Sequence, residues 1–309
     1  MRSIIITGGA GFIGSHLLLQ LLADGHEVTV LDNVSTGEWS HVPDGCEKWE
    51  MDIRSQEVIP RIMKARFDRI VHLAAQAMVN VSVDDPAFDA MENVMGTVNV
   101  LEAARKSEVG RVIFASTAAA YGNVPEKELP VKEDRQLAPM SFYGLSKVTA
   151  EKYLAMYQEL FGLDYVILRF ANVYGERQGD RGEGGVISIF AKKIAAGEGV
   201  TVYGDGEQTR DFIYAGDIAA GIRAAMATEK CNTVYNLSTR TETSLNELIR
   251  IMEDVSRTKI DVSYGTPRTG DICRSMLDNS RTVEGLAWKP QTSLPKGLKN
   301  TVDYFKSKS

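Results

Sequence analysis

Hydrophobic and polar residues follow two alternating spacings along the first half of the chain. Short runs rich in β-branched residues predict strands at Ser3–Thr7, Glu27–Asp32, Arg69–Ala74, Arg111–Ser116 and Tyr165–Phe170. Between them, apolar residues recur every three or four positions and predict helices at Phe12–Ala23, Ala87–Lys106 and Tyr143–Phe161. Strands alternating with helices predict a doubly wound α/β fold, in which helices cover both faces of a parallel sheet.

This alternation stops after Asn172. The segment Tyr174–Gly185 is rich in glycine and charged residues and predicts a surface loop, and the elements beyond it are short and mixed. We therefore predict two domains with a cleft between them. The larger comprises residues 1–170 together with about 211–240, and a smaller mixed C-terminal domain comprises residues 171–210 and 241–309.

Composition narrows the class of protein. The chain has 309 residues, 44% of them apolar, and a net charge of −6, which argues against a nucleic-acid-binding surface. Its three cysteines, Cys46, Cys231 and Cys273, form no C-x-x-C pair, so a reducing cytoplasmic setting is expected. The four histidines lack metal-ligand spacing, and no run of 18 apolar residues predicts a membrane span.

A glycine-rich turn directly follows the first predicted strand and opens a helix. Gly8, Gly11 and Gly14 let backbone N–H groups approach a pyrophosphate at the positive end of that helix. The next strand ends at Asp32, 18 residues beyond Gly14, where a carboxylate accepts hydrogen bonds from a ribose. Asn33, not a basic residue, follows Asp32. The pattern predicts a dinucleotide site that prefers NAD to NADP.

Three further residues predict chemistry at the same edge of the sheet. Tyr143 and Lys147 are four apart on a predicted helix and share one face, so the ammonium should lower the pKa of the phenol and make it a base. Thr117 lies just past the end of a parallel strand, where such folds bind ligands. Each signal alone is common, but their order along the chain favours one catalytic cluster.

Motifs along nearly the whole chain carry a family resemblance. They are TGGAGFIGSH at 7–16, LDN at 31–33, MDIR at 51–54, HLAAQ at 72–76, ENVMGT at 92–97, STAAAYG at 116–122, YGLSK at 143–147, RFANVYG at 169–175, YGDGEQTRDFIY at 203–214 and RTGDICRSMLD at 268–278. In these stretches the chain resembles the extended short-chain dehydrogenases, and within them the NAD-dependent sugar-nucleotide epimerases. The resemblance implies a Rossmann-type NAD-binding domain, a substrate-binding C-terminal domain and a UDP-sugar substrate.

The resemblance also implies roles for individual residues. The implied cofactor site comprises Gly8, Gly11, Phe12, Ile13, Gly14, Asp32, Asn33, Asp52, Ile53, Leu73, Ala74, Ala75, Asn93, Tyr143 and Lys147, with Asp52 and Ile53 beside the adenine. The implied substrate site comprises Thr117, Asn172, Arg210, Arg268, Asp271 and Ser275. In it Arg210 and Arg268 hold the two phosphates, and Asp271 binds the nucleoside ribose.

The residues after Thr117 separate the reactions of this family. Related dehydratases carry Asp-Glu there and related decarboxylases keep the Glu, whereas this chain has Ala118 and Ala119, which cannot move protons. The expected reaction is therefore C4 epimerisation of a UDP-hexose through a 4-keto intermediate. A 4-epimerase of another nucleotide sugar such as a UDP-uronic acid, a nucleotide-sugar oxidoreductase and a cofactor-sensing regulator remain alternatives.

Two finer expectations follow from the same resemblance. Ser275 is a small residue at a position that borders the sugar pocket in such epimerases, so the N-acetylated UDP-hexoses are expected to fit beside UDP-glucose and UDP-galactose. The predicted helices Ala87–Lys106 and Tyr143–Phe161 carry extra apolar residues. Equivalent helices pair between subunits in this family, so a homodimer is expected.

Overall fold

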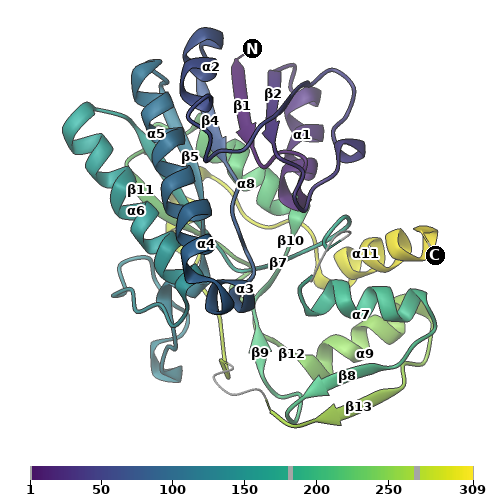
Figure 1. Cartoon of the computed structure of the whole chain (residues 1–309). Helices are drawn as coiled ribbons and strands as arrows, with labels where there is room; N and C mark the ends of the chain where they lie inside the picture. The colour runs from purple at the N-terminus through teal and green to yellow at the C-terminus, as the bar shows by residue number, and fades with distance from the viewer. Residues whose placement is uncertain (1, 180–183, 268–271, 309) are drawn as a thin grey trace.

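The computed structural model describes residues 2–179, 184–267 and 272–308, and its centre is a parallel β-sheet. The strands of this sheet are β1 (Ser3–Thr7), β2 (Glu27–Asp32), β3 (Glu47–Glu50), β4 (Arg69–His72), β5 (Arg111–Thr117), β6 (Tyr165–Phe170) and β11 (Thr233–Leu237). Within the described ranges these seven strands lie in the order β11–β6–β5–β4–β1–β2–β3 (Figure 1). The order reverses direction beside β1, and ligand sites form at such switch points in doubly wound sheets.

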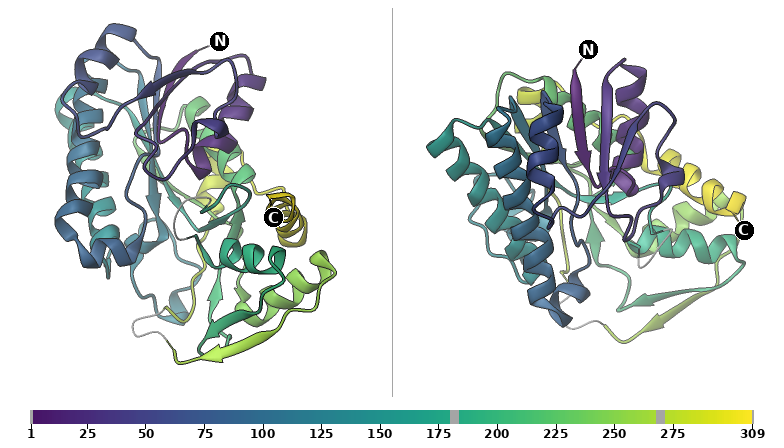
Figure 2. Two further views of the ribbon diagram at one scale, coloured as in Figure 1. Left: turned by 45° about the vertical axis from the view of Figure 1, so that its right-hand side comes forward. Right: turned by 45° about the horizontal axis from the view of Figure 1, so that its top comes forward.

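Helices cover both faces of this sheet, as Figure 2 shows. The layers are formed by α1 (Phe12–Ala23) with α8 (Ala215–Ala227) on one face, and by α2 (Val58–Ala65), α5 (Gly96–Lys106) and α6 (Phe142–Phe161) on the other. Strand β1 serves both layers because its side chains alternate: Ile4 and Ile6 join one core and Ile5 joins the other. The predicted doubly wound α/β fold is confirmed.

The helix predicted at Ala87–Lys106 is not continuous. The structure has α3 (Val79–Asp84), α4 (Pro86–Ala90), a π-helical turn at Met91–Met95 and then α5. Asp85 caps α4 by accepting a hydrogen bond from the backbone N–H of Phe88, and Pro86 occupies the first turn. Two strand limits also differ from prediction, since β4 ends at His72 and β5 extends to Thr117.

A third core lies beside the central sheet. It is formed largely by α7 (Val186–Ala195), α9 (Leu245–Ser256) and α11 (Leu294–Lys308), with α10 (Ser280–Leu286) nearer the sheet against β11. Three short strand pairs accompany it: β7 (Asn172–Tyr174) with β10 (Phe212–Tyr214), β8 (Val200–Tyr203) with β13 (Val262–Gly265), and β9 (Thr209–Arg210) with β12 (Thr243–Ser244). The domain limits given above stay a prediction.

Short 3₁₀ turns complete the described chain at Trp39–His41, Ala118–Tyr121 and Glu126–Glu128. None of the helices within the described ranges combines the length and apolar character that a membrane crossing requires. Over the same ranges, no group of three or more His, Cys, Asp or Glu side chains is arranged to hold a metal ion.

Candidate active site

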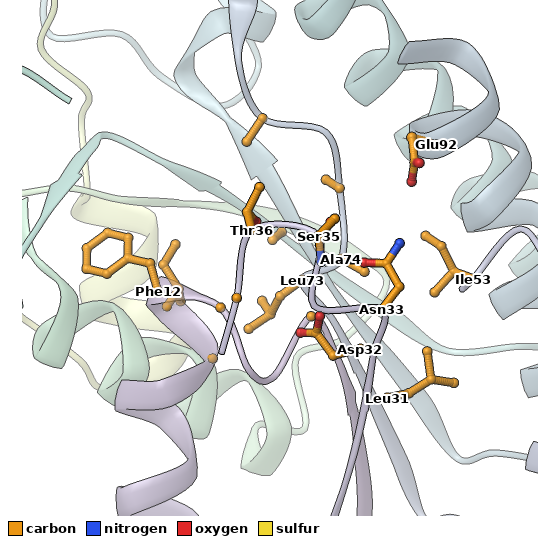
Figure 3. A pocket seen from close by; sticks show the side chains of 18 of the residues that line it. Phe12, Leu31, Asp32, Asn33, Ser35, Thr36, Ile53, Leu73, Ala74 and Glu92 are labelled. Carbon is orange, nitrogen blue, oxygen red and sulfur yellow. Dashed lines mark hydrogen bonds between the residues drawn. The ribbon is translucent and has the colours of Figure 1, made fainter. Parts of the chain in front are cut away.

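A cavity opens at the carboxyl ends of the central strands, beside the glycine-rich turn (Figure 3). Its lining comprises Gly8, Gly11, Phe12, Ile13, Gly14, Leu31, Asp32, Asn33, Ser35, Thr36, Gly37, Met51, Ile53, Leu73, Ala74, Ala75, Ala77, Glu92, Ala115, Ser116, Tyr143, Lys147 and Phe170. The glycine turn, the acid that ends β2 and the Tyr–Lys pair of α6 therefore share one cavity, although they are far apart in the sequence.

The glycine turn is shaped by close backbone contacts. Gly8 has a φ of +72°, and a Cβ there would lie 2.6 Å from the backbone nitrogen of Ala74. A Cβ on Gly14 would lie 2.6 Å from the carbonyl oxygen of Gly8. Helix α1 begins after Gly11, its N-cap residue. Because Gly11 has no side chain to bind them, the N–H groups of the first turn stay available to a ligand. This cradle fits the pyrophosphate of a dinucleotide.

Asp32 lines the cavity, and its carboxylate accepts two hydrogen bonds from the protein. Its carboxylate accepts one hydrogen bond from the backbone N–H of Ala10 at 2.9 Å and one from that of Val34 at 2.8 Å. Burial raises the pKa of Asp32, and these two hydrogen bonds oppose that shift. A carboxylate offers about four lone-pair positions, so two remain for ribose hydroxyls.

Helix α6 carries Tyr143 and Lys147, which also line the cavity. The helix begins after Ser141, whose hydroxyl accepts a hydrogen bond from the backbone N–H of Gly144 at 3.1 Å. The hydroxyl of Thr117, at the end of β5, lies near that of Tyr143 and lowers the pKa of the phenol. Thr117 also accepts from the backbone N–H of Ala119 at 3.1 Å, so its own proton is left to donate toward Tyr143.

The pKa of Tyr143 is shifted in the direction opposite to the one predicted from its spacing to Lys147. The ammonium of Lys147 donates to the carbonyl oxygen of Ala115 at 3.0 Å, and burial lowers the pKa of Lys147 to about 8 against the opposing effects of Asp89 and Glu151. Burial raises the pKa of Tyr143, the opposite direction to that expected from Lys147. The reason is that desolvation outweighs the effect of the Thr117 hydroxyl, while Lys147 is turned to a backbone carbonyl.

Comparison with known proteins fits this arrangement. The profile of the NAD dependent epimerase/dehydratase family matches residues 4–238. The chain belongs to this family. The UDP-glucose 4-epimerase of Mycolicibacterium smegmatis is 40% identical over 315 residues, which cover the full length of both chains. The predictions of the family, of an enzyme and of NAD as cofactor are confirmed.

Two solved structures are similar over almost the whole chain. The UDP-glucose 4-epimerase of Thermotoga maritima with UDP-glucose has a TM-score of 0.95 and 39% sequence identity, and covers 99% of both chains. The UDP-N-acetylglucosamine 4-epimerase of Methanobrevibacter ruminantium M1, in complex with UDP-N-acetylmuramic acid, has a TM-score of 0.94 and 34% identity, and covers 100% of this chain and 99% of that one. The epimerase fold therefore extends from end to end.

Two residues that the resemblance assigns to the cofactor are bound to other protein groups in this epimerase-family chain. Asn93 is 2% exposed, donates to the carbonyl oxygen of Gln76 at 2.9 Å and to the hydroxyl of Ser146 at 3.1 Å, and so ties the π-helical turn to α6. Asp52 is held by the side chain of Arg54, whose hydrogen bonds lower the pKa of Asp52 to about 2. Neither lines the cavity.

Those residues assigned to the sugar nucleotide that the structure describes lie outside this lining as well. Asn172 is exposed at the start of β7, and Ser275 is half-buried near β9. The guanidinium of Arg210 donates to the carbonyl oxygens of Thr209 at 2.8 Å and Ile272 at 2.6 Å. Arg268 and Asp271 lie outside the described residues.

The cavity also contains residues that the sequence analysis did not assign. They are Leu31, Ser35, Thr36, Gly37, Met51, Ala77, Glu92, Ala115, Ser116 and Phe170. Ser35, Thr36 and Gly37 follow Asp32 closely, and small and hydroxyl residues just past a strand end were an available signal. Glu92 carried none, because it belongs to a helix that the pattern predicts as continuous.

Proposed function

We propose that this protein interconverts UDP-hexoses by epimerisation at C4, with UDP-glucose and UDP-galactose as the principal pair. The observation that carries the proposal is that Tyr143 and Lys147 line one cavity with the glycine turn and Asp32, and that Thr117 acts on the hydroxyl of Tyr143. The residues that follow Thr117, Ala118 and Ala119, form a 3₁₀ turn and bring no acid or base to the site. One hydroxyl pair therefore serves both half-reactions.

Each side chain has a defined task in this proposal. Tyr143 removes the proton of the 4-hydroxyl group and later returns it, while Thr117 hydrogen-bonds the same oxygen. NAD, when bound, supplies the reversible acceptor of the C4 hydride. When cofactor and sugar occupy the cavity, the positive charge of Lys147 stabilises the phenolate form of Tyr143. The sugar passes through a 4-keto state and regains the same hydride on its other face, so there is no net oxidation.

The cofactor and sugar-nucleotide residues follow the resemblance. Gly8, Gly11 and Gly14 would hold the pyrophosphate and Asp32 the adenosine ribose. Asn172, Arg210, Arg268 and Asp271 would hold the UDP moiety, since guanidinium groups suit phosphates. The homologous UDP-glucose and UDP-N-acetylglucosamine 4-epimerases support a UDP-sugar without deciding which one.

The surroundings of Ser275 favour acceptance of the N-acetylated pair as a second activity. Its neighbour Arg274 is a long side chain that would fill a sugar pocket, but its guanidinium is bound to Glu242 and lies 3.3 Å from Glu126. The ion pairs hold Arg274 away from the position assigned to Ser275. A serine there leaves room for a C2 acetamido group.

We also propose a cytoplasmic homodimer. Large apolar side chains are exposed on the helices expected to pair: Phe88, Met91, Met95, Phe142, Leu145, Tyr153, Met156, Leu160 and Phe161. Such a concentration of apolar surface is typical of a subunit contact. Cys46, Cys231 and Cys273 are free, which fits a reducing compartment.

A panel of UDP-sugars incubated with the purified protein, with products separated by chromatography, tests the function. Interconversion of UDP-glucose and UDP-galactose without added oxidant is expected, and Tyr143→Phe is the inactive control. Turnover of UDP-uronic acids alone would replace the hexose assignment. Tight NAD binding with no conversion of any sugar would support a cofactor-sensing protein and refute the proposal.

A further inference from the structure

One buried amide near the carboxyl end of β11 is bound to both parts of the proposed active site. Asn236 is fully buried and pairs in register with Arg169 of β6. A buried polar side chain is costly unless its hydrogen bonds are made, so such groups are nearly always bonded. The partners of Asn236 therefore show which parts of the molecule it joins.

On one side, Asn236 is bound to the turn that follows Thr117. Its Oδ1 accepts a hydrogen bond from the hydroxyl of Tyr121 at 2.7 Å. Tyr121 ends the 3₁₀ turn whose N-cap is Thr117. The guanidinium of Arg169 donates to the same Tyr121 hydroxyl at 3.0 Å. The turn that begins at Thr117 is therefore anchored to Asn236 at its far end.

Arg169 is itself fixed to α6, the helix that carries Tyr143 and Lys147. Its guanidinium binds the carboxylate of Glu151 through two hydrogen bonds of 2.9 and 2.6 Å. Glu151 lies one helical turn beyond Lys147 and also accepts from the hydroxyl of Ser116 at 2.5 Å. The ends of β5 and β6 and the middle of α6 are thus joined in one buried network that reaches Asn236.

On its other side, Asn236 is bound to segment 275–278, which begins at Ser275. Its Nδ2 donates to the carbonyl oxygens of Val131 and Asp278, both at 3.0 Å. The backbone N–H of Val131 donates to the carbonyl oxygen of Met276 at 2.9 Å, and that of Asp278 donates back to Val131 at 2.8 Å. The chain directly after Ser275 is therefore held by Asn236, both directly and through Val131.

The chemistry of an amide is needed at this position. Asn236 offers an acceptor to one hydroxyl group and both of its side-chain N–H groups to carbonyl oxygens. An aspartate of the same shape would turn an oxygen toward those two carbonyl oxygens. An alanine would remove the partner of three buried polar groups at once.

We propose that Asn236 is a positioning residue for epimerisation, which sets the place of segment 275–278 relative to Thr117 and Tyr143. The proposal rests on the proposed function, in which the sugar turns over as a 4-keto intermediate before it regains its hydride. A displaced pocket wall allows this intermediate to leave too early. An escaping 4-keto sugar leaves its C4 hydride with the cofactor and its hydroxyl proton with Tyr143, so each escape inactivates one enzyme molecule.

The test compares Asn236→Ala and Asn236→Asp with wild type in the UDP-glucose assay, with a carbonyl-trapping reagent in solution. The kcat/KM of both variants should fall by ~10-fold or more, as expected when a binding group is misplaced. Their progress curves should level off early, and mass spectrometry should detect trapped 4-keto sugar that wild type does not release. NAD affinity, measured by fluorescence titration without sugar, should equal that of wild type.

Tyr121→Phe is a milder second variant. It keeps the aromatic ring and removes only the hydroxyl that joins Asn236 to the turn after Thr117. It should release 4-keto sugar as well, in a smaller amount. Thermal melting shows which variants are folded, and Tyr121→Phe decides the matter if neither Asn236 variant is.

Asn232→Ala is the matched control. Asn232 directly precedes β11 at its opposite end, where its amide donates to Asp164 at 2.8 Å and accepts from the backbone N–H of Tyr165 at 3.0 Å. Its φ of +59° strains an alanine, so this variant also loses stability. It should nevertheless keep the kcat/KM of wild type and release no 4-keto sugar.

Two results would overturn the proposal while wild type is active. One is wild-type kcat/KM with no trapped 4-keto sugar in the folded Asn236 and Tyr121 variants. The other is equal loss and equal release in Asn232→Ala, which would trace both effects to lowered stability. If wild type converts no UDP-sugar, the proposed function is wrong and this proposal fails with it, so the two failures are told apart by the wild-type assay.

Discussion

The cofactor cavity and the region around Ser275 are built from different kinds of structure. The cavity lies at the ends of the parallel strands of one sheet, and its Asp32 and Lys147 side chains are hydrogen-bonded to the backbone. The region around Ser275 lies among strand pairs of two to four residues and is held by contacts between separate segments. The backbone N–H of Thr209 donates to Cys273, that of Val131 donates to Met276, and the guanidinium of Arg274 is bound to Glu242. The cavity thus takes its residues from the ends of one sheet, whereas the Ser275 region is assembled from loops, in which related proteins vary most.

The strongest test of this contrast is Tyr143→Phe. Tyr143 is the only phenol among the described residues that line the cavity, and its removal should reduce kcat by more than ~100-fold, as expected for a missing general base. NAD affinity should change little, because the glycine turn and Asp32 are untouched. Steady-state assays and a cofactor titration of the same preparation check both parts. Near-normal turnover would remove Tyr143 from its role.

Cofactor choice should show the next largest effect. Asp32 has two hydrogen bonds and two open acceptor positions in the cavity, so a 2′-phosphate would meet a carboxylate directly. Like charges at contact cost several kcal/mol, so NADP should bind ~100-fold more weakly than NAD. The Asp32→Asn variant keeps the shape of the side chain but loses its charge, so the difference between its affinities for NAD and NADP should be smaller. Equal affinities in wild type would show that Asp32 does not reach the ribose.

A buried histidine at the end of β4 should make the stability of the folded protein depend on pH. His72 lies 2.7 Å from the hydroxyl of Thr7 and 3.0 Å from that of Thr97, and burial lowers its pKa to about 3. Thr97 donates its own proton to the carbonyl oxygen of Asn93, so it accepts from His72, which assigns the neutral ring with a proton on Nε2.

The sign follows from proton uptake. Between about pH 6.5 and 3 the unfolded chain protonates this histidine and the folded chain does not, so stability falls as the pH falls. From pH 7 to 5 the loss from this group is about 2 kcal/mol. The free energy of unfolding in urea, measured at pH 7 and pH 5, checks this prediction. The His72→Gln variant is expected to lose less stability than wild type between these two pH values. An identical pH dependence in the variant would contradict the neutral assignment.

The smallest expected effect concerns the sugar region. Ser275→Tyr should reduce kcat/KM for UDP-N-acetylglucosamine by ~10-fold or more through steric exclusion, and leave UDP-glucose turnover near its original rate. The UDP-glucose rate of the same variant is the internal control. If wild type does not accept the N-acetylated sugar at all, Ser275 is not the residue that limits the pocket.

Sequence periodicity predicted the inner strands well because each is apolar and bounded by turns. It missed β3, since three of the four residues of Glu47–Glu50 are exposed and read as a polar loop. It also missed the break at Met91–Met95, because a π-helical turn keeps apolar residues at nearly helical spacing. Element boundaries depend on hydrogen bonds that an apolar pattern does not encode.

Several residues that the sequence motifs single out lie together at the cavity. Gly8, Gly11 and Gly14 line the cavity, as do Asp32, Tyr143 and Lys147. Side chains were harder to predict, because a motif does not say which neighbour takes up a polar group. Asp52 accepts hydrogen bonds from Arg54 and Asn33, and Glu92 instead lines the cavity, which follows from tertiary contacts alone.

The π-helical turn sets the rotational phase of the helix that covers this part of the sheet. Such a turn holds one residue more than an α-helical turn, and each residue of an α-helix corresponds to about 100° of rotation. Deletion of one residue at Met91–Met95 would rotate α4 by about that angle relative to α5. Asp89, which is 1% exposed and bonded to Gln76 and Asn93, would then turn outward, and the exposed Phe88 would change sides. A change of about 1.5 Å in helix length thus decides which face of the helix meets the cofactor wall.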